Sequence, residues 1–147
     1  MPLNVAGLKG GLRGCFSTPP STVQGCARAW ADAMVAYSAG VVPPSTTVTA
    51  AGDALSSALV TAFEAPSAAP AMEVAFSQFA VSVGLGMAPT YAAVPPAAPV
   101  GFGPQFAGPK PETHADAAEA IGSLIDLWMR TGVSTLVAPP NTPQPWT

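Results

Sequence analysis

Prolines divide this chain of 147 residues into a few intervals long enough to fold as helices. The 18 prolines fall largely near residues 19–20, 43–44, 66–70, 89–111 and 139–145. Proline inside a helix removes a backbone hydrogen bond and clashes with the preceding turn, so each cluster marks a boundary. We therefore expect helices in the intervals and extended backbone at the clusters.

Four intervals have the three-and-four spacing of apolar residues that is typical of amphipathic helices. The helices are expected at about 22–39, 49–64, 70–83 and 113–132. A capping box begins at Ser21 ("STVQ"), and Thr113 with Asp116 forms a second capping pair. The predicted buried faces are, in order: Val23, Ala27, Trp30, Met34 and Tyr37; Ala51, Leu55, Ala58, Leu59, Ala62 and Phe63; Met72, Ala75, Phe76, Phe79 and Val83; Ala117, Ile121, Leu124, Ile125 and Trp128.

The remaining segments are predicted to be extended. Residues 1–20 contain four closely spaced glycines and end in the two prolines Pro19 and Pro20, which predicts an extended N-terminal arm. Residues 133–147 contain four prolines, which predicts an extended C-terminal tail. The sequence thus predicts an all-α protein, a small bundle of about four helices in one helical domain over 21–132, interrupted by a long Pro/Gly-rich extended crossover at about 84–112.

Four aromatic residues lie on this proline-rich backbone, which cannot bury them locally. They are Tyr91, Phe102, Phe106 and Trp146. Two alternatives are equally open: these side chains fold back on their own bundle, or they reach into neighbouring subunits. The four residues are therefore candidate subunit contacts.

The low charge of the chain limits its partners. Only 9% of the residues are charged, and the five basic residues are scattered along a chain of net charge -3. A nucleic-acid partner is not expected without a basic cluster. No membrane span is expected either, because the nearest apolar stretch, 71–86, contains Glu73 and several polar residues. A surface built largely of small, uncharged residues is poorly protected against self-association.

The sequence predicts no catalytic, cofactor-binding or metal-binding residues, and no small-molecule substrate. A nucleophilic triad requires a histidine, and the single one, His114, follows a predicted helix cap at the surface. Asp116, Glu119 and Asp126 lie on one predicted helix, where Glu119 and Asp126 share a face, but a solvated helix face accounts for these carboxylates better than a catalytic pair does. Two cysteines and one histidine do not supply a zinc site.

Cys15 and Cys26 flank the turn-rich segment "FSTPPSTVQG". A disulfide between them is geometrically feasible. Two reduced, packed thiols are the favoured alternative, because no secretion signal precedes them. Neither arrangement implies chemistry.

In the order of its helical and proline-rich segments, the chain resembles small accessory structural proteins of tailed-phage virions and related contractile injection particles. The resemblance rests on a helix with Trp30, Ala33 and Tyr37 leading to "VVPPST", then "GLGMAPTYAAVPP", then "THADAAEAIGSLIDLWMRTG". It implies a non-enzymatic virion protein of the neck, tail or capsid, assembled in the host cytoplasm. Its partners would be copies of itself and other structural proteins of the particle.

Two functional hypotheses follow. The first is a structural subunit of a multi-copy assembly that contacts its neighbours through extended arms. The second is a bacterial binding module or effector whose proline-rich segment is recognised by a partner domain. An enzyme is the least favoured class.

Overall fold

A computed structural model describes residues 2–147, and over this range the chain forms six helices and three short strands. The elements are α1 (Val5–Ser17), α2 (Val23–Ser38), α3 (Val48–Glu64), α4 (Ala68–Leu85), β1 (Tyr91–Val94), α5 (Phe102–Ala107), α6 (His114–Met129), β2 (Val133–Leu136) and β3 (Pro143–Pro145). The protein is therefore mostly helical, as expected, but it is not all-α.

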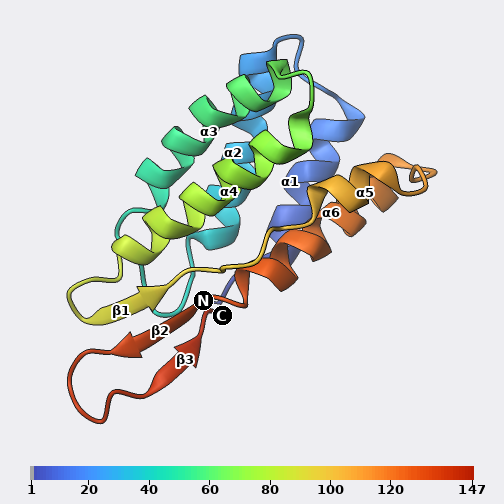
Figure 1. Ribbon diagram of the computed structural model, residues 1–147. Coiled ribbons are helices and arrows are strands. Elements are labelled where there is room, and N and C mark those ends of the chain that lie inside the picture. Colours follow the sequence, from blue (N-terminus) through green and yellow to red (C-terminus); the bar gives the residue numbers. More distant parts are fainter. Residues whose placement is uncertain (1) are drawn as a thin grey trace.

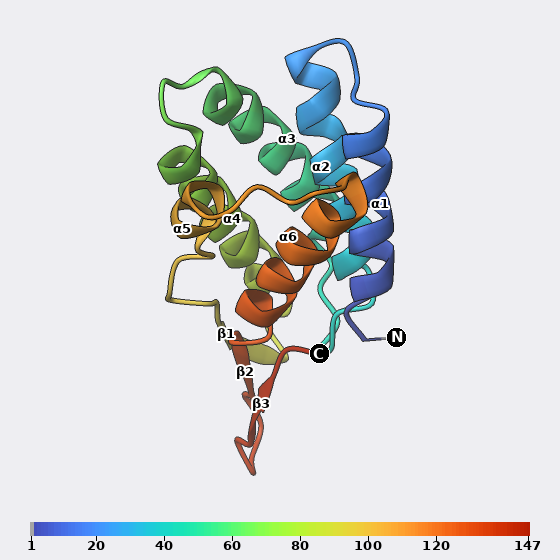
Figure 2. The same ribbon diagram turned by 90° about the vertical axis from the view of Figure 1, so that its right-hand side faces the viewer.

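The five long helices pack as a bundle with the sheet at one end (Figures 1 and 2). In the order of packing, α6 lies against α1, α1 against α2, α2 against α3 and α3 against α4. Side chains of α4 and α6 are also in contact. The ring centroids of Phe76 on α4 and Trp128 on α6 lie 6.4 Å apart. The start of α1 and the end of the chain both lie at the sheet end of the bundle (Figure 1).

The four helices predicted from apolar spacing are confirmed, with boundaries shifted by a few residues at most. Thr113 caps α6 as expected, since its hydroxyl accepts a hydrogen bond from the Asp116 amide at 3.1 Å. The cap of α2 is Thr22 rather than Ser21, and its hydroxyl accepts from the Gly25 amide at 3.0 Å. Capping by Thr satisfies a backbone amide that the first helical turn leaves unpaired.

The prediction of an extended N-terminal arm is wrong, because residues 5–17 form helix α1. Its glycines lower the intrinsic helix propensity, but Leu8, Leu12 and Cys15 form a buried stripe at helical spacing. The Asn4 side chain caps the helix by accepting from the Gly7 amide at 2.9 Å. Tertiary packing of this stripe outweighs the glycine penalty.

The prediction of one extended crossover at 84–112 is also wrong. Residues 84 and 85 belong to α4, and the segment then contains strand β1 and the short helix α5. Helix α5 starts at Phe102, and the carboxylate of Glu73 on α4 accepts hydrogen bonds from amides at its N-terminal end. A capping group 29 residues away in the sequence cannot be recognised from local patterns.

The tail is likewise not an extended arm, because it folds back as part of a sheet. The strand order is β1-β2-β3, and both pairs are antiparallel. Tyr91 is paired with Leu136 in the register of β1 and β2, and Val133 with Pro145 in that of β2 and β3. Prolines are tolerated in β3 because it is an edge strand. Part of the predicted extended tail, Val133–Leu136, thus forms a paired strand.

The core is continuous across all of these parts. An aromatic cluster lies at its centre, where Trp30 of α2 contacts Phe63 of α3, Phe76 of α4 and Phe102 of α5 at ring separations of 6.0–6.5 Å. Helix α1 adds Leu8 and Leu12, and the tail adds Trp146, to the same core.

Candidate functional site: the outer face of α4

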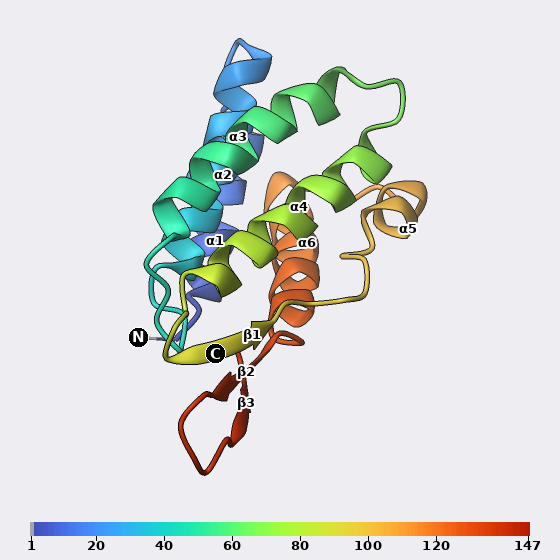
Figure 3. The same ribbon diagram turned by 60° about the vertical axis from the view of Figure 1, so that its left-hand side comes forward.

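Helix α4 differs from a typical surface helix because it is apolar on both its inner and its outer side. Its inner side buries the predicted face, including Met72, Phe76, Phe79 and Val83. In Figure 3 α4 lies on the outside of the bundle, and no other described element is drawn across its outer side. The six exposed residues of the helix, which we call the outer seam, are Pro70, Val74, Ser77, Gln78, Val81 and Leu85.

The outer seam displays three large aliphatic side chains and no charged ones. Val74 is 57% exposed, Val81 44% and Leu85 69%. Single exposed aliphatic residues are ordinary on protein surfaces, but several in one row on one helix are typical of an interaction surface. The outer seam is therefore the candidate functional site.

The single charged residue of α4, Glu73, does not add charge to this surface. Its carboxylate accepts hydrogen bonds from the amides of Val100 at 2.6 Å and of Gly101 and Phe102 at 2.7 Å each. Gly101 has a φ of 103°, a left-handed conformation that favours glycine. The contact attaches the segment before α5 to α4 and satisfies the carboxylate.

Two shallow grooves run beside the outer seam. One lies between α3 and α4, has an open volume of about 340 Å³, and is lined by Ala54, Leu55, Ala75, Ser77, Gln78, Phe79, Val81 and Ser82. The other, of about 320 Å³, separates α4 from residues 97–100 and Trp128. The Trp128 indole donates to the carbonyl of Ala98 at 2.7 Å, which fixes that wall. The first groove has no charged residue in its lining.

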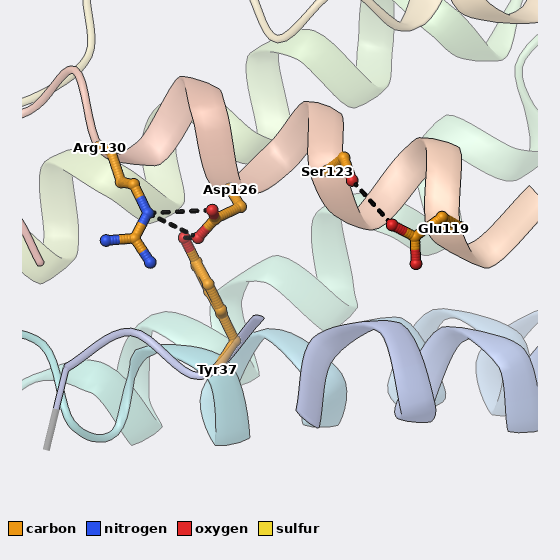
Figure 4. Close-up of polar contacts among 5 residues, drawn as sticks. All are labelled: Tyr37, Glu119, Ser123, Asp126 and Arg130. Atoms are coloured by element: carbon orange, nitrogen blue, oxygen red, sulfur yellow. Dashed lines mark hydrogen bonds and ion pairs between the residues drawn. The ribbon is translucent and has the colours of Figure 1, made fainter. Parts of the chain in front are cut away.

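A polar cluster centred on Asp126 joins α2 to α6 (Figure 4). The Tyr37 hydroxyl donates to Asp126 at 2.9 Å, and Arg130 Nε donates to both oxygens of the same carboxylate at 2.9 and 3.0 Å. Burial, and then the negative charge of Asp126, raise the pKa of Tyr37. A tyrosine held in its neutral form donates a hydrogen bond and does not act as a base, so this cluster is a structural link.

The other carboxylates on α6 also have structural partners. Asp116 accepts a hydrogen bond from the hydroxyl of its own cap, Thr113, at 2.7 Å. Glu119 forms an ion pair with Lys9 of α1 at 2.5 Å and accepts from Ser123 at 3.4 Å (Figure 4). His114 is exposed in the first turn of α6. These groups do not converge on a common cleft.

The structure places two of the four predicted contact aromatics within the chain's own core. Phe102 and Trp146 are both fully buried. Tyr91 is half-buried in β1. Phe106 is 47% exposed and stacks on Phe102, with ring centroids 5.7 Å apart. Of the two alternatives left open by the sequence, folding back on the bundle is the correct one for Phe102 and Trp146.

The two cysteines are free thiols. Cys15 is buried in α1 and Cys26 is half-buried near the start of α2. Burial, and then the neighbouring Cys26, raise the pKa of the Cys15 thiol. Since the thiolate is the reactive form, this shift keeps Cys15 unreactive at neutral pH.

Residues 2–147 hold no cluster of metal ligands and one helix with the length and composition of a membrane span. Over residues 2–147 no group of three or more His, Cys, Asp or Glu side chains is placed to hold a metal ion. Helix α4 is long and apolar enough to cross a membrane, with a mean hydropathy of 1.2, and 39% of its residues are buried. Its packing on α3, α5 and β1 accounts for the apolar character of its inner side, but not of the outer seam.

The outer seam was not predicted from the sequence, because the apolar spacing over 70–83 indicates the buried face of that helix and not its exposed one. Val74 and Val81 fall between the core positions of that helix and were not assigned to a face. The signal in the sequence that could have indicated this surface is a helix with large apolar residues on both of its sides.

No protein-family model, curated protein or solved structure matches this chain.

Proposed function

We propose that this protein is a non-enzymatic structural subunit of a multi-copy assembly, held in place through the outer seam of α4. One observation carries the proposal: a surface helix presents a row of exposed aliphatic residues with no charge among them. Monomeric proteins seldom maintain such a surface, because it favours association. The low charge of the chain as a whole, 9%, favours the same function.

The contacts of the titratable groups also favour a structural function. Glu73 binds backbone amides, Asp126 holds Tyr37 and Arg130, and Glu119 pairs with Lys9. Each of these groups joins two helices or a helix and a loop. Such contacts stabilise the fold and occupy these three carboxylates.

The particle that we propose is a tailed-phage virion or a related contractile injection particle, with the chain in its neck, tail or capsid-associated region. This finer proposal rests on the resemblance in the order of parts described above. Its partners would be copies of the chain and other structural proteins, and assembly would take place in the host cytoplasm.

The proposed contact between subunits differs from the one that the sequence predicts. Extended arms were expected to join neighbours, but α1 and the tail both pack into the chain's own core. The proline-rich segment is likewise fixed, since Val100 and Phe102 are buried and their amides are bound by Glu73. A rigid helical surface therefore replaces the arms as the proposed contact.

Sedimentation of a lysate from the cells that make the protein tests this function. We expect the chain in fast-sedimenting particles, in several copies per particle by quantitative mass spectrometry. Leu85→Glu is expected to move the chain to the slow fraction, because a charge in an apolar interface is desolvated without a partner. Leu127→Glu is the matched control, since Leu127 on α6 is also 69% exposed. Wild-type chain found only in the slow fraction would overturn the proposal.

A further inference from the structure

We infer that the outer seam of α4 binds the outer seam of a second copy of this chain, with the two helices antiparallel about a two-fold axis. The inference rests on the proposed function and names the first partner of the same surface. Three features support it: the spacing of the exposed residues, their chemistry and the absence of charge.

The spacing of the outer seam is the same when read in either direction. Its residues, 70, 74, 77, 78, 81 and 85, are separated by steps of four, three, one, three and four. A two-fold axis between 77 and 78 places each residue opposite an exposed residue of the second copy. The resulting pairs are Pro70 with Leu85, Val74 with Val81, and Ser77 with Gln78. Two helices pack along a seam of this three-and-four spacing.

The chemistry of the seam is also self-complementary. Its apolar residues lie toward both ends and pair with each other in the antiparallel arrangement. At the centre, the amide of Gln78 and the hydroxyl of Ser77 can each donate and accept a hydrogen bond. Neither group is therefore left without a partner when the two copies meet. A parallel arrangement would instead place each residue against its own type, and would not follow from the reversed spacing.

The absence of charge favours a second copy over a different protein. Different partners are selected largely by complementary charges, which steer encounter and exclude wrong partners. The outer seam offers none, because its six residues are uncharged and the carboxylate of Glu73, the single charged residue of α4, is bound by backbone amides. Interfaces between identical subunits are the more apolar class. A two-fold contact brings the same surface of both subunits together.

Sedimentation equilibrium of the full chain tests the inference through a charge exchange. We expect the wild type to dimerise and Val74→Glu to raise the dissociation constant at least about 100-fold, because the carboxylate is desolvated. The double variant Val74→Glu with Val81→Lys should bind within about tenfold of the wild type, because the antiparallel register pairs the opposite charges twice. Val137→Glu is the control, because Val137 is 55% exposed and Val74 is 57% exposed. This variant should leave the dissociation constant unchanged.

The contradicting results separate this inference from the proposed function. A double variant as weak as Val74→Glu would overturn the antiparallel pairing. A wild type that stays monomeric, while Val74→Glu still prevents incorporation into native particles, would overturn the second copy as partner but leave the proposed function standing. If Val74→Glu changes neither dimerisation nor incorporation into particles, both the inference and the proposed function fail. Binding of wild type, and not of Val74→Glu, to phosphatidylcholine vesicles in place of dimerisation would also overturn the inference.

Discussion

Trp146 links the tail to residues 132–134 and, through Ser134, to Met87 after α4. Its indole donates to Ser134 at 2.7 Å, and Ser134 in turn donates to the sulfur of Met87 at 3.1 Å. Its backbone amide donates to the Gly132 carbonyl at 2.9 Å. A Cβ on Gly132 would lie 2.5 Å from the indole ring, so only glycine fits against it. One side chain thus completes the core at the sheet end.

Replacing this side chain tests its contribution to stability. Trp146→Ala should lower the free energy of unfolding by about 3–5 kcal/mol, because it leaves a large cavity and removes the hydrogen bond that the indole donates to Ser134. Urea denaturation followed by circular dichroism measures the change. The control Val137→Ala, at a 55% exposed position, should change it by less than about 0.5 kcal/mol. A loss below about 1 kcal/mol for Trp146→Ala would contradict the packing described.

The raised pKa of Tyr37 predicts that the protein loses stability at alkaline pH. Its pKa in the folded state lies above the ordinary value of 10.0, so the folded chain holds this proton more tightly than the unfolded chain. The contribution is complete below about pH 10 and is lost as the pH rises above it. Cys15, also raised, adds the same sign of change above about pH 9.

Tyr37→Phe removes the tyrosine part of this dependence and leaves the part from Cys15. We expect the free energy of unfolding to fall less between about pH 8 and about pH 11 in the variant than in the wild type. At neutral pH the variant should be less stable by about 0.5–1.5 kcal/mol, since the hydrogen bond to Asp126 is lost. Urea denaturation at both pH values measures this; equal alkaline losses would show that the proton on Tyr37 is not linked to folding.

Among the elements, α1 shows most clearly how packing overrides local propensity. Its glycines have different surroundings: a Cβ on Gly11 would lie 2.9 Å from the Cβ of Ala33 on α2, whereas a Cβ on Gly10 meets nothing within 4 Å. Gly11 therefore allows close approach of the two helices. Gly10 contributes only its cost in backbone entropy.

Two alanine substitutions in α1 should therefore have opposite effects. Gly10→Ala is expected to stabilise the protein by about 0.5–1 kcal/mol through helix propensity. Gly11→Ala is expected to destabilise it by about 1–3 kcal/mol, because the short contact with Ala33 forces the helices apart. Thermal or urea unfolding of the two variants makes the comparison. Stabilisation by both would mean that α1 does not pack closely on α2.

The elements that could be predicted from sequence are those whose signals are local. The spacing of Trp30, Met34 and Tyr37, and the cap at Thr113, lie within a few residues of what they determine. Helix α5 and the sheet depend on distant groups: Glu73 caps the first, and β2 must pair with β1 about 40 residues earlier. Composition alone suggested extended backbone there. The outer seam was missed for a related reason, since exposure is a property of the packed molecule.

At the scale of the whole molecule, the fold buries seven of its eleven aromatic side chains and leaves one helix with an apolar outer row. The inner side of α4 completes the core, so its composition follows from folding. The outer side carries Val74, Val81 and Leu85, which folding does not require. Association of copies through this row is the central claim of the account.

Multi-angle light scattering of the full chain over a concentration series tests that claim most directly. The wild type and Leu127→Glu are predicted to reach masses above the 14.6 kDa of one chain as concentration rises. Leu85→Glu, altered at an equally exposed leucine on the outer seam, is predicted to stay at 14.6 kDa. A wild type that remains at 14.6 kDa throughout, or a Leu85→Glu variant that associates as the wild type does, would contradict it.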